Sequence, residues 1–207
     1  MESVVKSNSN IKTFLNQLGL AGFISSLCLL SSWTAIVMCL NEQYKLMVIA
    51  ATVAFIFDAL DGYVARKLNQ ESELGRKLDG MIDVVNYSLL AAIITWKVLL
   101  PGIWGYIVGF IILLTGILRL IRFDNEGFIE INKVKYYRGI LVCYLSLTAI
   151  TLLVIQKHFY IPVEIIGMIL VIVSILQLSN IKTRKTGVLP FWMVLILVLM
   201  VVSLLWL

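Results

Sequence analysis

The sequence predicts an all-α fold, a polytopic transmembrane helical bundle with about seven spans. Of the 207 residues, 60% are hydrophobic and only 14% are charged, a composition unlike that of soluble domains. The apolar residues also form long runs with short polar breaks between them. Because backbone groups in a bilayer must satisfy their own hydrogen bonds, runs of this length favour helices. We expect a single transmembrane domain over residues 1–207.

The elements follow in order along the chain. Residues 1–11 are polar and are expected to lie in the membrane interface. The first apolar run is too long for a signal peptide and has no convincing cleavage site, so we interpret it as a span. The predicted spans are 14–40, 46–66, 78–100, 104–122, 138–156, 161–179 and 188–206.

The distribution of lysine and arginine predicts the orientation. If the amino terminus is cytoplasmic, all but three of the 17 basic residues fall in inside segments, the exceptions being Lys45, Lys97 and Lys157. Such an excess is typical of cytoplasmic loops. The net charge of +5 is therefore explained by membrane lipids, and no nucleic-acid partner is expected. We expect an integral cell-membrane protein.

Four aspartates lie in or beside the second and third spans, where an acid costs roughly 2.5–3.5 kcal/mol on insertion scales. Positions three or four apart share one face of a helix. Asp58 and Asp61 therefore form one stripe, and Asp79 and Asp83 form another. The loop 67–74 joins the two helices at their cytoplasmic ends. The sequence thus predicts four carboxylates that face one another near the cytoplasmic side.

Clustered carboxylates repel one another unless cations neutralise them. Hard cations such as Mg²⁺ or Mn²⁺ prefer oxygen ligands, and two of them can clamp a phosphoryl group. Gly62, Ala65 and Gly75 leave room for a bulky group on the same stripes, although small residues also serve helix packing. Arg66 suits a phosphate, and equally suits an anchor at the membrane edge.

Two classes of function remain open from the residues alone: phosphoryl chemistry with metals, and a cation-transport path. Transport usually needs polar residues in several spans, whereas here the acids concentrate in one helical hairpin. A non-catalytic membrane scaffold is the remaining alternative.

The hairpin carries a pattern of eight fixed residues, Asp58-x2-Asp61-Gly62-x2-Ala65-Arg66-x8-Gly75-x3-Asp79-x3-Asp83. It resembles, without a gap or a substitution, the signature of the CDP-alcohol phosphotransferases. The resemblance implies a bundle with a six-span core, to which this chain would add one span. It also implies a homodimer and an enzyme that transfers a phosphatidyl group from a CDP-lipid, such as CDP-diacylglycerol, to a small polar alcohol.

The resemblance further implies a role for each signature residue. The ligands of two divalent cations, Mg²⁺ or Mn²⁺, would be Asp58, Asp61, Asp79 and Asp83. Asp83 would also be catalytic, because it would deprotonate the acceptor hydroxyl that attacks the β-phosphorus and displaces CMP. The nucleotide pocket would be lined by Gly62, Ala65, Arg66 and Gly75.

The acceptor is predicted from three further segments. DVVNYS, RLIRF and YYRGI resemble the DxVxFG, RLARF and FxGLP segments of bacterial and archaeal phosphatidylserine synthases. The departures are Leu-Leu-Ala-Ala in place of Gly-Val-Ala-Pro, and Ile-Leu in place of Leu-Pro. Because the three segments are otherwise similar to those of phosphatidylserine synthases, the resemblance implies L-serine as the first choice of acceptor, followed by glycerol 3-phosphate and inositol derivatives. Asn86, Arg119 and Arg122 are the candidate acceptor-binding residues, although both arginines would also serve as anchors at the membrane edge.

Overall fold

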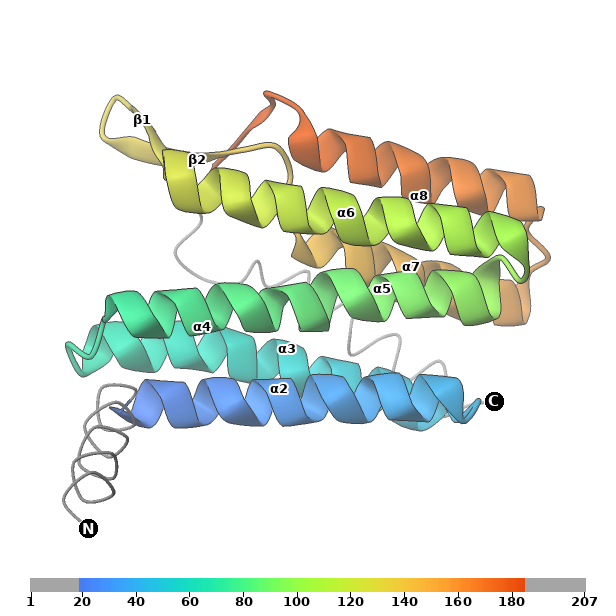
Figure 1. Ribbon diagram of the computed structural model, residues 1–207, viewed down its shortest axis with the longest axis horizontal. Coiled ribbons are helices and arrows are strands. Elements are labelled where there is room, and N and C mark those ends of the chain that lie inside the picture. Colours follow the sequence, from blue (N-terminus) through green and yellow to red (C-terminus); the bar gives the residue numbers. More distant parts are fainter. Residues whose placement is uncertain (1–18, 185–207) are drawn as a thin grey trace, which may run out of the picture.

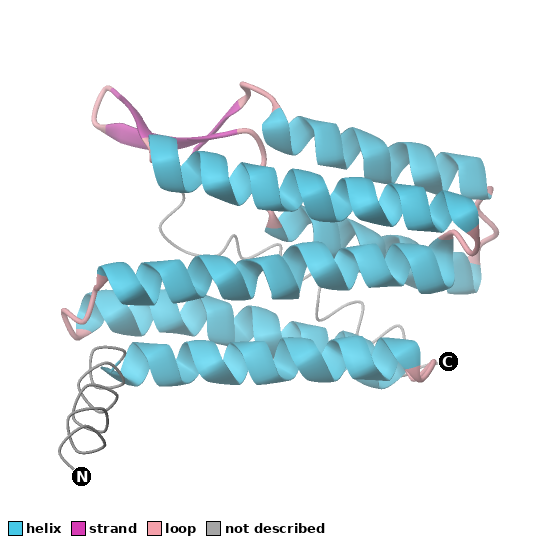
Figure 2. Ribbon diagram, in the orientation of Figure 1, coloured by secondary structure: helices cyan, strands magenta, loops and turns pink. Residues whose placement is uncertain are grey.

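The computed structural model describes residues 19–184, which form a bundle of elongated helices with a small sheet at one end (Figures 1 and 2). The α-helices are α2 (Gly19–Leu40), α3 (Tyr44–Lys67), α4 (Glu73–Asp83), α5 (Leu90–Ile94), α6 (Ile103–Glu126), α7 (Cys143–His158) and α8 (Val163–Leu178). Two π-helical segments, η1 (Val84–Leu89) and η2 (Thr95–Leu99), continue α4 and α5. Together these four form one uninterrupted helix, Glu73–Leu99.

Four of the described helices are long and apolar enough to cross a membrane: α2, α3, the helix Glu73–Leu99 and α6. Helices α7 and α8 have 16 residues each, fewer than the ~20 needed to cross a typical bilayer. The structure therefore indicates a membrane protein, but the predicted count of seven spans is not confirmed. The expected interfacial segment 1–11, the start of the first span and the span at 188–206 lie outside the described residues.

The expectation of an all-α fold is corrected by a three-stranded antiparallel sheet, in the order β1-β2-β3. Its strands are β1 (Ile129–Ile131), β2 (Val134–Arg138) and β3 (Lys182–Arg184). Asn132 and Lys133 join β1 to β2 with φ values of 51° and 64°, as a two-residue type I′ hairpin requires. The fifth predicted span, 138–156, begins later than expected, as helix α7, because Arg138 still pairs with Lys182 in the sheet.

Gly139 fixes the sheet against the end of α8. Its φ is +72°, and a Cβ at this position would lie 2.0 Å from the backbone oxygen of Gln177, so only glycine fits. Its N–H donates to the Ile181 oxygen at 2.7 Å, and its own oxygen accepts from the Thr183 hydroxyl at 2.8 Å. The sheet therefore lies beyond the carboxyl ends of α6 and α8, as Figure 1 shows.

Helix α6 lies directly against the helix Glu73–Leu99, which is the predicted third span, because glycines form the contact. A Cβ on Gly109 would approach the Ala92 oxygen to 3.0 Å, and a Cβ on Gly116 would lie 2.0 Å from the Ser88 hydroxyl oxygen. Small residues allow such close approach between membrane helices. The contact holds Arg119, one turn beyond Gly116, beside the third span.

Two apolar clusters stabilise the bundle. The larger one joins α2, α3, α6, α7, α8 and the third span. The smaller one consists of Cys28, Ala54 and Ile82, with Phe57 and Leu78 packed against it. Because it ties α2, α3 and α4 together, this second cluster holds the three helices next to the aspartates in a fixed arrangement.

Candidate active site and metal centre

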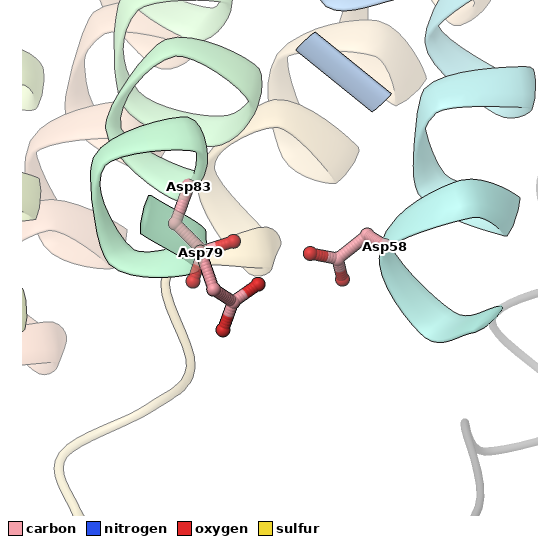
Figure 3. Close-up of side chains that lie close together, drawn as sticks. All are labelled: Asp58, Asp79 and Asp83. Atoms are coloured by element: carbon pink, nitrogen blue, oxygen red, sulfur yellow. The ribbon is translucent and has the colours of Figure 1, made fainter. Parts of the chain in front are cut away.

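Three of the four predicted carboxylates meet between α3 and α4. Asp58 of α3 points towards Asp79 and Asp83 of α4, as Figure 3 shows. One oxygen from each of the three lies within 4.8 Å of the others, and all three side chains are half-buried. A convergent set of carboxylate oxygens is the donor set that Mg²⁺ and Mn²⁺ prefer. These residues therefore fit a divalent cation.

Local structure explains why the three side chains converge. The backbone N–H of Gly75 donates to the Ser72 hydroxyl at 3.0 Å, which caps α4 and makes Glu73 its first residue. Such a cap satisfies one of the free N–H groups at a helix start. Asp79 and Asp83 are then four residues apart on one face of α4. Their helix therefore presents both carboxylates to α3.

The three carboxylates of the cluster form no ion pair with a basic side chain of the described residues. Within residues 19–184, the ion pairs of lysine and arginine involve other acids, none of them Asp58, Asp79 or Asp83. Adjacent carboxylates cannot all stay ionised without a compensating positive charge. The arrangement is therefore one that a bound cation would complete.

Asp61, the fourth predicted ligand, lies outside this group of three. Its side chain is buried, at 5% exposure, and it accepts a 2.6 Å hydrogen bond from the Ser25 hydroxyl of α2. Asp58 has a comparable partner, because the Tyr87 hydroxyl of η1 donates to it at 2.7 Å. Each aspartate of α3 is thus held by a hydroxyl from a neighbouring helix.

The predicted nucleotide-binding residues lie at the end of α3 and the start of α4. A Cβ on Gly62 would meet only the side chain of Arg66, at 3.4 Å, and one on Gly75 would meet only the Ser72 hydroxyl, at 3.1 Å. Neither glycine therefore serves close packing against another helix of the described chain. Ala65 shares this stretch of α3 and is half-buried.

Arg66 is exposed at the end of α3. In the part of the chain that the structure describes, it takes part in no ion pair. Its guanidinium, which lies beside Gly62, therefore has no ion pair among the described residues to break before binding an anion.

Arg119 is the predicted acceptor residue that the structure brings to the cluster. Its side chain is 5% exposed, and its guanidinium carbon lies 5.5 Å from the ring centre of Phe123 and 5.6 Å from that of Tyr137. Its Nε has no hydrogen-bond partner among the described residues. Arg119 also interacts electrostatically with Asp83. A buried cation with an unused donor beside a carboxylate is suited to bind an anionic group.

Arg122 has different neighbours. Its Nη1 donates to the Leu178 oxygen at 2.9 Å, its Nη2 donates to the Asn180 side chain at 2.7 Å, and its Nε lies 3.3 Å from Glu126. These contacts tie α6 to the end of α8. The structure therefore brings only one of the two predicted arginines towards the carboxylates.

Asn86, the remaining candidate for the acceptor, is buried. Its Nδ2 lies 3.8 Å from the Cys28 sulfur of α2, a weak hydrogen bond between helices.

The sequence did not predict that the hydroxyls of Ser25 and Tyr87 would bond to the aspartates of α3. Tyr87 was within reach of prediction, because it follows Asp83 by four residues on the same helix. Ser25 was not, because it is 36 residues from Asp61 in the chain.

Comparisons with known proteins agree with this geometry. A family model described as CDP-alcohol phosphatidyltransferase matches residues 18–207. An archaetidylserine synthase of Methanothermobacter thermautotrophicus is 30% identical over 118 residues, which cover 56% of this chain and 51% of that protein. This chain therefore spans about half the length of that relative.

Two proteins named CDP-diacylglycerol–serine O-phosphatidyltransferase are also similar. The one from Methanocaldococcus jannaschii is 34% identical over 134 residues, which cover 64% of this chain and 61% of that protein. The one from Bacillus subtilis is 28% identical over 142 residues, which cover 65% of this chain and 77% of that protein.

Proposed function

Because the chain belongs to the CDP-alcohol phosphatidyltransferase family, we propose that it transfers a phosphatidyl group from a CDP-diacylglycerol-type lipid to L-serine and releases CMP. The observation that carries this proposal is the convergence of Asp58, Asp79 and Asp83, which form no ion pair with a lysine or arginine among the described residues. The names of the similar proteins support a lipid donor and serine as the acceptor.

We propose that the carboxylates of Asp58, Asp61, Asp79 and Asp83 hold two divalent cations, Mg²⁺ or Mn²⁺. When bound, these ions would neutralise the pyrophosphate of the donor. Asp61 would join the other three ligands from the same face of α3, where the Ser25 hydroxyl already orients its carboxylate.

The protein's own part in the reaction is then positioning and proton transfer. Asp83 lies farthest from the α3–α4 loop on its stripe, and we assign to it the proton of the acceptor hydroxyl. The oxygen left on the acceptor attacks the β-phosphorus, the bond to the α-phosphate bridge breaks, and CMP leaves. Arg66 would bind a phosphate of the donor, and the small residues Gly62, Ala65 and Gly75 would receive the cytidine.

We assign the binding of the acceptor alcohol to Arg119. Two observations support this assignment: the Nε donor of Arg119 is unused among the described residues, and Arg119 lies close enough to Asp83 to interact with it. A carboxylate such as that of serine is a group that arginine binds well. Glycerol 3-phosphate also carries an anion and remains the next acceptor, followed by inositol derivatives. Asn86 remains a candidate donor to the acceptor. Arg122 uses its donors on Glu126 and α8, so it is the weaker candidate of the two arginines.

We further propose that the site faces the cytoplasm, that the amino terminus is inside, and that 1–207 is one domain acting as a homodimer. Basic residues support the orientation, because Arg66, Lys67, Arg76 and Lys77 all lie at the end of the α3–α4 hairpin that carries the site. The dimer rests on the family resemblance.

An acceptor panel tests the proposal. Membranes containing the protein are incubated with CDP-diacylglycerol, Mn²⁺ and labelled serine, glycerol 3-phosphate or inositol, and the lipid products are identified. We expect CMP and labelled phosphatidylserine. A labelled lipid from another alcohol would correct the acceptor alone. No CMP with any acceptor, together with metal-ion flux in proteoliposomes, would support a transporter instead.

A further inference from the structure

Tyr87 makes two contacts with one stretch of α3. Its side chain is 3% exposed, and its hydroxyl donates to Oδ2 of Asp58 at 2.7 Å. Its ring packs edge-to-face on Phe55, with 5.6 Å between the ring centres and 76° between the planes. Phe55 precedes Asp58 by three residues, so both lie on the same face of α3. The contact with Phe55 fixes the position of the tyrosine ring, and the tyrosine hydroxyl then bonds to Asp58.

The π-helical segment η1 explains how Tyr87 reaches this position. The N–H of Leu90 donates to the oxygen of Val85, an i→i+5 bond that widens the turn. Three consecutive residues, Asn86, Tyr87 and Ser88, are buried there, more than one face of an ordinary helix would bury. Single π turns often occur at functional sites. Here the wide turn lies immediately after Asp83, so Asp83 and Tyr87 approach Asp58 from one helix.

A hydrogen bond from a buried hydroxyl to a carboxylate restrains the rotation of that carboxylate and is stronger than a bond between neutral groups. Oδ2 of Asp58 is occupied by the phenol, and Oδ1 is free of it. Asp58 is also the one member of the three-carboxylate group that comes from α3. Its orientation therefore decides whether the two helices present one joint set of oxygens.

We infer that Tyr87 is a positioning residue for the metal centre, which holds Asp58 in the orientation that faces Asp79 and Asp83. The inference rests on the proposed function, because it requires that the cluster bind divalent cations. Outer hydrogen-bond partners of metal ligands typically contribute 10–100-fold to metal affinity. The similar DxVxFG segment has phenylalanine at this position, so the fold should accept Tyr87→Phe, which removes a single oxygen atom.

The test measures Mn²⁺ binding to the purified full-length protein in detergent, without substrate, from the loss of the free Mn²⁺ signal in electron paramagnetic resonance. We expect Tyr87→Phe to weaken binding about tenfold, the lower end of the usual range. In turnover assays it should raise the Mn²⁺ concentration for half-maximal rate by a similar factor, while the rate at saturating Mn²⁺ recovers.

Two variants serve as controls. Tyr44→Phe removes a phenol hydroxyl at the opposite end of α3, beside Lys157, and should leave Mn²⁺ binding unchanged. Phe55→Leu disturbs the packing of the Tyr87 ring and keeps its hydroxyl, so it should lower the melting temperature more than the Mn²⁺ affinity. The comparison separates the hydroxyl from the ring.

Equal Mn²⁺ affinity in wild type and Tyr87→Phe would overturn the inference and leave the proposed function intact. So would equal losses of affinity in Tyr87→Phe and Phe55→Leu, or a Tyr87→Phe protein that does not fold, because each would assign Tyr87 to the fold alone. Absence of Mn²⁺ binding in the wild type would overturn both the inference and the metal site proposed above.

Discussion

The polar residues between α3 and α4 and those at the ends of α6 and α8 contrast in how they are paired. Asp58, Asp79 and Asp83 converge without an ion pair to any lysine or arginine of the described residues. Arg122, by contrast, is bonded to Glu126 and to the end of α8. A polar residue in a membrane helix is a functional candidate by default. The contrast favours, as candidates, the charged residues that form no ion pair within the described chain.

The glycines of the two regions also differ in what lies next to them. Gly116 has the Ser88 side chain where its Cβ would be, so it serves packing. Gly62 and Gly75 face only a flexible arginine end and a hydroxyl, so they do not serve packing against another described helix. Glycine thus serves helix contact at Gly116, whereas at Gly62 and Gly75 we propose that it leaves room for the nucleotide.

The largest expected effect comes from removing the proposed base. Asp83→Asn should lower kcat for CMP release by roughly 10²–10⁴-fold, the usual contribution of general-base catalysis. The shape of the residue is preserved, so the melting temperature should change little. Glu130→Gln, an exposed acid on β1, is the matched control and should keep full activity. Full turnover by Asp83→Asn would contradict the assignment.

The two arginines sharpen the comparison further. Arg119→Ala should raise the KM for serine by about 10–100-fold, because a hydrogen bond to a charged group contributes about 1.5–3 kcal/mol. Arg122→Ala should instead lower the melting temperature and leave the KM for serine near its wild-type value. Steady-state kinetics with serine varied at saturating CDP-diacylglycerol would measure both. Equal changes in KM would remove the distinction between the two residues.

A smaller effect is expected at the glycine contact between α6 and the helix Glu73–Leu99. Gly116→Ala should destabilise the protein by roughly 1–3 kcal/mol, because the added methyl overpacks the contact with Ser88. Gly80→Ala, in α4 with nothing within 4 Å of its Cβ position, should be neutral or stabilising by up to about 1 kcal/mol. Thermal unfolding in detergent measures both, and Ser88→Gly should restore part of the loss in Gly116→Ala. Two variants of equal stability would contradict the packing account.

The smallest expected effect comes from an exposed ion pair that joins the start of α4 to the end of α6. Arg76 and Asp124 lie 2.6 Å apart, with just over half of each side chain exposed. Such pairs contribute at most about 1 kcal/mol and are weakened by salt. Asp124→Asn should therefore shift the melting temperature by little at low salt and by nothing measurable at high salt. A large loss of stability would show that this pair does more than join two helix ends.

The aspartate hairpin could be predicted from sequence because helical spacing places Asp58 opposite Asp79 and Asp83 once the two helices are antiparallel. The hairpin Ile129–Arg138 was missed, although the alternation of Ile129 and Ile131 before Asn132 and Lys133 is a recognisable strand-and-turn pattern. It lay in a stretch interpreted as a polar break between spans.

Other features depend on contacts that no local pattern contains. Arg122 reaches Leu178, 56 residues away, and Asp61 reaches Ser25, 36 residues away. Until the helices pack, nothing distinguishes Arg122 from Arg119, because both sit on one face near a membrane edge. The π turn at Val84–Leu89 likewise includes a contact from a distant part of the chain, because Gly116 of α6 lies against Ser88.

The rate of CMP release from CDP-diacylglycerol by the purified protein, measured with serine and with controlled divalent cations, tests the central proposal most directly. If the carboxylates of α3 and α4 work through bound cations, release stops in EDTA, returns on adding Mn²⁺ or Mg²⁺, and stays near zero in an Asp79→Asn protein at every metal concentration. CMP release that continues undiminished in EDTA, or in Asp79→Asn, would contradict it.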